Sequence, residues 1–312
     1  MSTARGISLL ILLIVLPTTL LLSSQERDER ERITIEVDAV NVLVSVTDKA
    51  TGRFVTDLDI SRFRVYEEDV LQEITNFSQQ TNLPLTIAMC VDTSSSVKLK
   101  LKFEKTAALD FLYTIMKPTD RALLAEFDTG VTLLHDFTSN PNDLMEEIKQ
   151  LKAGGGTSLY DAIYLVAEQK LLYEAGRKTM IILSDGADLT SVQTFEDALR
   201  MAQFSEAAIY AISTTRFGAN IDHEGDNALK QLADSTGGQV FFPYSTSELS
   251  KSFTKLEEAL RSQYNIAYKP RNTRKDGTFR NIKVEVDHGG IRLRHRKGYY
   301  APTDGKAWLP LP

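Results

Sequence analysis

Three short segments of the chain carry oxygen-bearing side chains that could bind a metal ion. They are Asp92-Thr93-Ser94-Ser95-Ser96, Gly154-Gly155-Gly156-Thr157-Ser158 and Ser184-Asp185-Gly186. Asp92 and Asp185 offer carboxylates. Ser94, Ser96 and Thr157 offer neutral hydroxyls. Because all five are hard oxygen donors, they suit Mg²⁺, Mn²⁺ or Ca²⁺ and offer nothing to a thiophilic metal.

A cation would resolve the repulsion between the two carboxylates. Unit charges about 5 Å apart repel by roughly 3 kcal/mol at an effective dielectric near 20, and a divalent cation turns that repulsion into attraction. Two carboxylates and three hydroxyls leave at least one octahedral position to water or to a ligand from a partner. The consecutive glycines 154–156 let the backbone approach closely, because glycine tolerates most backbone angles.

The segments that carry these residues follow predicted strands of an α/β sheet. The apolar run 85–91 ends at Asp92, and the run 180–183 ends at Ser184 and Asp185. Both runs are typical of strands that are buried on two faces. In an open α/β sheet, ligands bind at the carboxyl ends of the strands, where the strand order reverses. We therefore expect these two strands to be neighbours and the three motifs to meet at one place.

Alternating strands and helices between residues 84 and 262 predict a doubly wound, mostly parallel sheet with helices on both faces. Asp128-Thr129-Gly130 is a hairpin signal between two strands. The predicted strands are 85–91, 121–127, 131–137, 180–183, 209–212 and 239–242. The predicted helices are 97–116, 159–173, 195–207, 227–235 and 247–261.

The five candidate ligands carry a resemblance to a known family. Asp92, Ser94, Ser96, Thr157 and Asp185 match, one by one, the metal-ion-dependent adhesion site of von Willebrand factor A domains. The resemblance covers residues 84–262 and implies a Rossmann-like fold. It also implies that the three hydroxyls touch the metal directly, that the two aspartates often act through water, and that a partner's carboxylate completes the shell. The flanking segments 44–49 and 298–302 resemble those of exported bacterial proteins related to this domain.

The segments on either side of this domain are rich in β structure. Residues 33–80 and 263–302 each hold too few predicted strands for an independent core. We therefore expect them to pair into one discontinuous β-sandwich into which the α/β domain is inserted, with residues 303–312 as a tail. Inserted domains of this kind need ends that lie close together.

The N-terminal residues read as an export signal. Arg5 precedes an apolar stretch over residues 7–22, and small residues follow it. Residues 1–24 are thus predicted to be a signal peptide or an uncleaved membrane anchor, followed by a charged spacer over residues 25–32. Under either interpretation the protein is expected to be extracytoplasmic, either periplasmic or secreted. If the segment is not cleaved, it is expected to be the protein's only contact with the membrane.

Composition excludes several classes of function. The net charge of −6 argues against nucleic acid as the main partner, because neutralising phosphates requires a basic face. Cys90 is the only cysteine, so no internal disulfide and no cysteine-based metal cluster can form. Its place in an apolar run is typical of a small core residue.

A hydrolase is the main alternative. Asp92, His135 and Ser158 occur in the order that subtilisin-like proteases use. However, His135 lies in a predicted strand without a following glycine, and the chain has no Gly-x-Ser-x-Gly motif. We therefore predict that the protein is not an enzyme.

Two further alternatives concern the candidate ligands. Ser94 and Ser96 could cap the next helix, and Thr157 could cap the helix that follows it. A metal could also stabilise the loops while binding occurs elsewhere. The sequence favours a binding role over both alternatives. In this interpretation the site holds a divalent cation, Mg²⁺ or else Mn²⁺ or Ca²⁺, and the cation binds an aspartate or glutamate of a protein partner.

Overall fold

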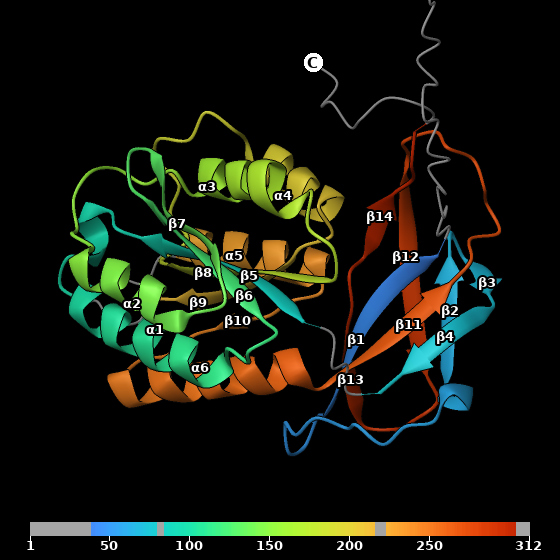
Figure 1. The fold of residues 1–312 in the computed structure, drawn as a ribbon. Coiled ribbons are helices and arrows are strands. Elements are labelled where there is room, and N and C mark those ends of the chain that lie inside the picture. The colour runs from blue at the N-terminus through green and yellow to red at the C-terminus, as the bar shows by residue number, and fades with distance from the viewer. Residues whose placement is uncertain (1–38, 80–83, 216–222, 304–312) are drawn as a thin grey trace, which may run out of the picture. The chain divides into compact units, whose positions relative to one another are not determined.

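The computed structural model describes residues 39–79, 84–215 and 223–303. Its central sheet has six strands in the order β10-β9-β8-β5-β6-β7 (Figure 1). These strands are β5 (Leu85–Asp92), β6 (Arg121–Phe127), β7 (Val131–Thr138), β8 (Arg177–Ser184), β9 (Ala208–Ser213) and β10 (Val240–Phe241). All neighbours pair in parallel except β7, which runs antiparallel to β6. The predicted α/β fold class is confirmed.

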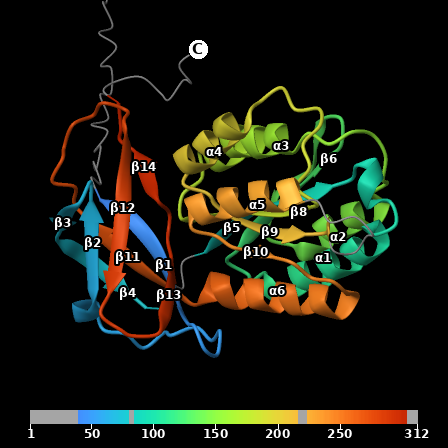
Figure 2. The same cartoon turned by 180° about the vertical axis from the view of Figure 1, so that it is seen from behind.

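Helices cover both faces of this sheet (Figures 1 and 2). One face carries α1 (Leu101–Ile115), α2 (Pro141–Gln150) and α6 (Thr246–Arg261), and the other carries α3 (Leu159–Val166), α4 (Phe195–Phe204) and α5 (His223–Thr236). Side chains of β5 alternate between the two cores. Met89 and Val91 pack with α1 and α6, whereas Ala88 and Cys90 pack with α3 and α4. This alternation explains why the strand is apolar throughout.

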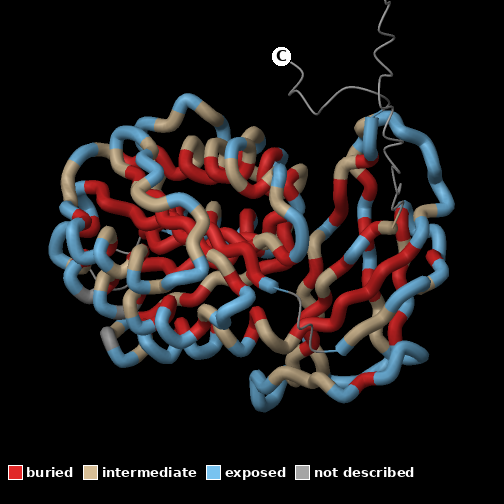
Figure 3. The backbone as a smooth tube through the Cα atoms, in the orientation of Figure 1, coloured by how far each residue is buried: buried red, intermediate tan, exposed pale blue. Residues whose placement is uncertain are grey.

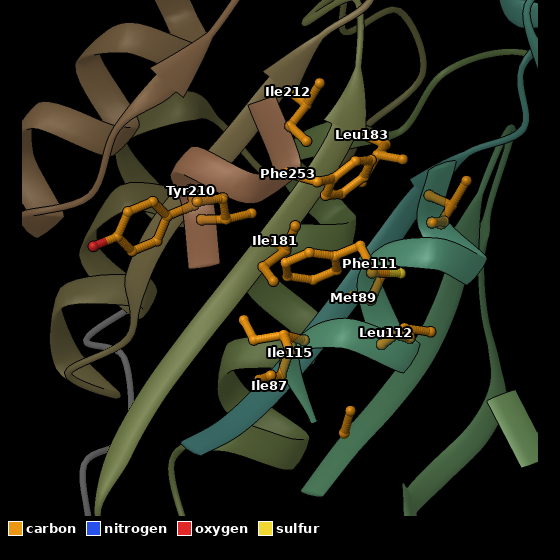
Figure 4. Packing of buried hydrophobic residues seen from close by; sticks show 14 of the residues in the cluster. Ile87, Met89, Phe111, Leu112, Ile115, Ile181, Leu183, Tyr210, Ile212 and Phe253 are labelled. Atoms are coloured by element: carbon orange, nitrogen blue, oxygen red, sulfur yellow. The ribbon is translucent and has the colours of Figure 1, made fainter. Parts of the chain in front are cut away.

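The core beneath α1 and α6 is closely packed (Figure 4). Phe111 of α1 and Phe253 of α6 stack with their ring centroids 4.7 Å apart. On the opposite face, Cys90 is buried, as predicted, and burial raises the pKa of its thiol to about 12. Cys90 is therefore a protonated core residue rather than a reactive thiol.

The structure differs from the sequence expectation around two helices. The helix predicted from residue 97 begins at Leu101, because Ser95–Val97 forms a short 3-10 turn (η2). The helix predicted over 159–173 is an α-helix only to Val166 and continues as a π-helical segment, Ala167–Leu171 (η3).

Helix α2 was not predicted from the sequence. Asn140 begins this helix by accepting a hydrogen bond from the amide of Asn142 on its side chain, and Pro141 occupies its first turn. Both residues are favoured at these positions.

Two antiparallel sheets of four strands combine segments from before and after the α/β domain. Their orders are β13-β1-β11-β4 and β14-β12-β2-β3. The strands are β1 (Val40–Asp48), β2 (Phe63–Glu67), β3 (Val70–Gln72), β4 (Ile74–Ser78), β11 (Gln263–Tyr268), β12 (Phe279–Val286), β13 (Ile291–Arg294) and β14 (Gly298–Tyr300), with a 3-10 turn η1 (Ile60–Arg62). Side chains of both sheets share one core. Ser78 pairs with Asn265, so the chain leaves and re-enters this sandwich at adjacent positions.

Several predicted segments lie outside the described residues. These are the leader at residues 1–24, the spacer at 25–32 and residues 304–312 of the tail. In the part of the chain that the structure describes, no helix has the length and apolar character needed to cross a bilayer.

Candidate metal site

The candidate site lies where the strand order of the central sheet reverses. β5 and β8 are parallel neighbours, with Val91 opposite Leu183, so that Asp92 and Ser184 come next on adjacent strands. From this pair the chain continues to β6 on one side and to β9 on the other. The adjacency predicted for the first and third motifs is present.

A continuous chain of hydrogen bonds links four of the five candidate ligands. The amide of Ser94 donates to Oδ1 of Asp92 at 2.9 Å. The hydroxyls of Ser94 and Ser96 lie 2.9 Å apart, and Ser96 Oγ donates to Oδ2 of Asp185 at 2.8 Å. Residues that are 89 positions apart in sequence therefore meet through their side chains. The oxygen atoms of this chain are the donor atoms that a hard divalent cation would use.

Asp92 is fully buried at the base of this group. Burial raises the pKa of its carboxyl to about 6, and the negative charge of Asp185 contributes to the rise. Hydrogen bonds from Ser184 Oγ, at 2.6 Å to Oδ2, and from Ser94 oppose it. Ser184 was not among the predicted site residues, although its place directly before Asp185 on a buried strand could have indicated it.

Backbone hydrogen bonds hold Thr157 in place. They connect the loop that contains residues 154–158 to the loops that follow β5 and β8. The carbonyl of Thr157 accepts hydrogen bonds from the amides of Leu189 and Thr190 at 2.8 and 3.1 Å. Gly154 N donates to Thr93 O at 2.7 Å, and Ser95 donates to Gly155 O. Thr157 is buried, and it follows a glycine loop that is fastened to the Asp92 loop on one side and to the Asp185 loop on the other.

Two of the three glycines in that loop are required by their surroundings. Gly155 has φ +77°, and a Cβ there would lie 2.8 Å from the side chains of Asp128 and Thr129. A Cβ on Gly156 would lie 2.8 Å from Cγ2 of Thr190. These contacts confirm close backbone approach at 155 and 156, whereas a Cβ on Gly154 would meet nothing within 4 Å.

Glu104, on the inner face of α1, was also missed. It is 2% exposed, and both of its carboxylate oxygens lack a hydrogen-bond partner among the described residues. Burial raises its pKa to about 8, and the charges of Asp92 and Asp185 add to the rise, while Lys100 lowers it. Its spacing from Leu101 and Ala108 places it on the buried stripe of the helix, a position where the sequence pattern predicts an apolar residue.

The capping alternative is wrong for the serines. η2 receives no side-chain cap from Ser94, and α1 begins after Lys100 without one. The residue at the N-cap of α3 is Ser158 rather than Thr157, and it too makes no side-chain cap. The hydroxyls of Ser94 and Ser96 instead point into the group formed with Asp185.

The residues of the hydrolase alternative have other partners. Ser158 Oγ donates to Thr129 O at 3.0 Å and lies 2.7 Å from Thr190 Oγ1. His135 Nδ1 contacts the carbonyl oxygen of Asp136, and Asp92 bonds to Ser94 and Ser184. No hydrogen bond among the described residues joins Asp92, His135 and Ser158 to one another.

The donor set at the strand ends consists of two aspartates and hydroxyls. No group of three or more histidine, cysteine, aspartate or glutamate side chains in the described segments is arranged to hold a metal ion. Oxygen donors of this kind fit Mg²⁺, Mn²⁺ or Ca²⁺.

Solved structures with similar folds include two bacterial domains. One is a von Willebrand factor type A protein from Catenulispora acidiphila, with a TM-score of 0.48, 14% identity, and coverage of 85% of this chain and 74% of that chain. The other is the vWF domain of the type V pili tip protein Mfa5 from Porphyromonas gingivalis, with a TM-score of 0.49, 15% identity, and coverage of 58% and 96%.

Sequence comparison gives a family match for the segment that holds the candidate ligands. A human relative, von Willebrand factor A domain-containing protein 3B, is 27% identical over 161 residues, which are 50% of this chain and only 12% of that protein. Residues 87–187 match the family model of the von Willebrand factor type A domain. That range contains all five candidate ligands.

Proposed function

We propose that the chain is a binding module that recognises a protein partner through a divalent cation, because residues 87–187 match the family model of the von Willebrand factor type A domain. The cation, Mg²⁺ or else Mn²⁺ or Ca²⁺, is held by Asp92, Ser94, Ser96, Thr157 and Asp185. The partner supplies an aspartate or glutamate to the remaining coordination position.

The observation that carries this proposal is the hydrogen-bonded chain from Asp92 through Ser94 and Ser96 to Asp185. It gathers two carboxylates and two hydroxyls at the strand ends. Asp92 favours a neighbouring cation strongly, because burial disfavours its ionised form and a positive charge restores it.

The residues of this chain determine how the cation and the partner bind. The two carboxylates balance the charge of the divalent cation, so it is the open coordination position of the metal that attracts a partner's carboxylate. Cation and partner then strengthen each other's binding by the same factor, since linkage is reciprocal. Ser184 and the amide of Ser94 keep the Asp92 carboxylate oriented toward this group.

We also propose that the domain acts outside the cytoplasm. The support is the apolar stretch at residues 7–22 with Arg5 before it and small residues after it, a pattern that directs export.

The test compares two neighbouring serines of the same motif. Ser94→Ala removes a proposed ligand, whereas Ser95→Ala removes an exposed hydroxyl that, within the described residues, donates a hydrogen bond to Gly155 O and to no candidate ligand. Affinity capture from cell-envelope extracts is carried out with Mg²⁺ and with EDTA. Wild type and Ser95→Ala should retain the same partner in Mg²⁺ and lose it in EDTA, and Ser94→Ala should lose it in both.

A purely structural role for the metal predicts a different pattern. In that case Ser94→Ala would lower the melting temperature in Mg²⁺ but leave capture unchanged. Capture that does not depend on the cation would contradict the proposed function.

A further inference from the structure

Exposed apolar side chains stand on the two loops that leave the candidate metal site. Leu99, three residues after Ser96, is 91% exposed. Leu189 and Val192, in the loop between β8 and α4, are 76% and 87% exposed. Because β5 and β8 are adjacent and parallel, both loops leave the same edge of the sheet (Figures 1 and 3). Single exposed apolar residues are common on proteins, so their setting decides whether they matter.

The loop that carries Leu189 is fixed to the site itself. The amides of Leu189 and Thr190 donate to the carbonyl of Thr157. The carboxylate of Asp188 accepts a hydrogen bond from Tyr160 N at 3.0 Å, which fastens the start of the loop to the first turn of α3. The position of Leu189 is therefore set by the same residue that is proposed to bind the cation.

Hydrogen bonds also hold the C-terminal end of the loop between β8 and α4. Oδ1 and Oδ2 of Asp161 accept hydrogen bonds from Val192 N at 3.0 and 3.1 Å, and Oδ1 also accepts one from Gln193 N at 2.8 Å. In the middle of the loop, the hydroxyl of Thr190 lies 2.7 Å from that of Ser158. A backbone held at both ends and in the middle loses little conformational freedom when a partner binds, which favours affinity.

The charges near Leu99, Leu189 and Val192 indicate what charge a partner should carry. Lys98, beside Leu99, is exposed. The carboxylates of Asp161 and Asp188 accept hydrogen bonds from backbone amides and so hold the loop in place. The open position of a bound divalent cation and the exposed Lys98 together attract anions, and each of the two loops that leave the site carries exposed apolar side chains.

We propose that the partner binds with an aspartate or glutamate that is flanked by apolar residues, one packing toward Leu99 and the other toward Leu189 and Val192. This inference rests on the function proposed above and adds the chemical character of the partner segment. The cation supplies the attraction for the carboxylate. The apolar contacts supply selectivity, since one buried aliphatic side chain is worth roughly tenfold in affinity or more.

The test uses labelled synthetic peptides and the full chain, with binding followed by fluorescence anisotropy in Mg²⁺ and in EDTA. Three peptides share a length and differ at the centre: Gly-Leu-Asp-Leu-Gly, Gly-Ser-Asp-Ser-Gly and Gly-Leu-Asn-Leu-Gly. The first should bind at least about tenfold more tightly than the second in Mg²⁺. The third should not bind, and EDTA should abolish binding of the first two.

A double variant and a matched control locate the effect. Leu189→Ser with Val192→Ser should remove the preference for leucine over serine, while Mn²⁺ binding, measured by its paramagnetic signal, stays unchanged. Tyr173→Ser is the control, because Tyr173 is 80% exposed but precedes β8, at the opposite end of that strand from the site. This control should behave as wild type.

The outcomes separate this inference from the proposed function. Equal binding of the leucine and serine peptides in Mg²⁺, or binding of neither, overturns the inference while leaving the metal site intact. Binding of the asparagine peptide, or binding that persists in EDTA, overturns the proposed function as well. Self-association of the wild-type chain that the double variant abolishes would assign the surface to a second copy and overturn the inference.

Discussion

At the scale of single residues, Glu104 carries the clearest electrostatic consequence. Its carboxyl is buried and unpaired among the described residues, and its pKa is raised to about 8, first by burial and then by the charge of Asp92. An ionised carboxylate without a hydrogen-bond partner is costly in a protein interior. Without a cation, the folded protein therefore holds this proton across neutral pH.

This leads to a prediction for Glu104→Gln. The folded state keeps the proton up to about pH 8, whereas the unfolded chain releases it near the ordinary glutamate pKa of about 4.3, so stability falls as pH rises through that window. Glutamine has no such loss. In EDTA, urea unfolding should show that the stability of the variant relative to wild type rises by roughly 4 kcal/mol between pH 5 and pH 8.5. A difference that does not grow with pH would contradict the assignment.

The five candidate ligands could be selected from the sequence because each follows a readable strand or glycine loop. Ser184 and Glu104 could not be selected in the same way. Ser184 belongs to the third motif, but it matters through a contact with Asp92, 92 residues away, which the motif alone does not show. Glu104 lies on the apolar stripe of α1, and the sequence does not show that this carboxylate faces inward near two others.

At the scale of elements, the spacing of apolar residues predicted correctly which segments form the parallel strands. It predicted poorly at which residues those strands begin and end. β8 begins at Arg177 rather than at residue 180, because the backbone of residues 177–179 pairs with residues 85–87 of β5 although these positions are not all apolar. Such ends depend on partners distant in sequence. α2 was missed although its Asn140-Pro141 start is a local signal.

The strands of the sandwich give a prediction at this scale. β11 lies between β1 and β4, and β12 lies between β2 and β14, so residues 263–302 supply a central strand to each sheet. Deleting them should leave residues 39–79 unfolded, because two partial sheets cannot bury a shared core. Limited proteolysis should digest this segment in the deletion variant while wild type protects it. A protease-resistant fragment of these residues after the deletion would contradict the discontinuous arrangement.

At the scale of the whole molecule, the α/β architecture follows from alternating apolar strands and amphipathic helices, and its prediction was confirmed. The connection of the two β-rich ends was inferred from a shortage of strands, and the structure shows the reason: Ser78 and Asn265 are paired across the point of insertion. What the sequence could not supply is how the loops are fastened. Thr157 holds the Leu189 loop through a backbone carbonyl, which any residue type could provide.

The central claim is that Asp92, Ser94, Ser96, Thr157 and Asp185 hold one divalent cation. Anomalous diffraction from crystals soaked in Mn²⁺ tests it directly. We expect one anomalous peak within about 2.5 Å of the hydroxyls of Ser94 and Ser96, a peak that is absent from Ser94→Ala crystals soaked in the same way. A site without anomalous density, with the Ser94–Ser96–Asp185 hydrogen bonds still in place at saturating Mn²⁺, would contradict the account.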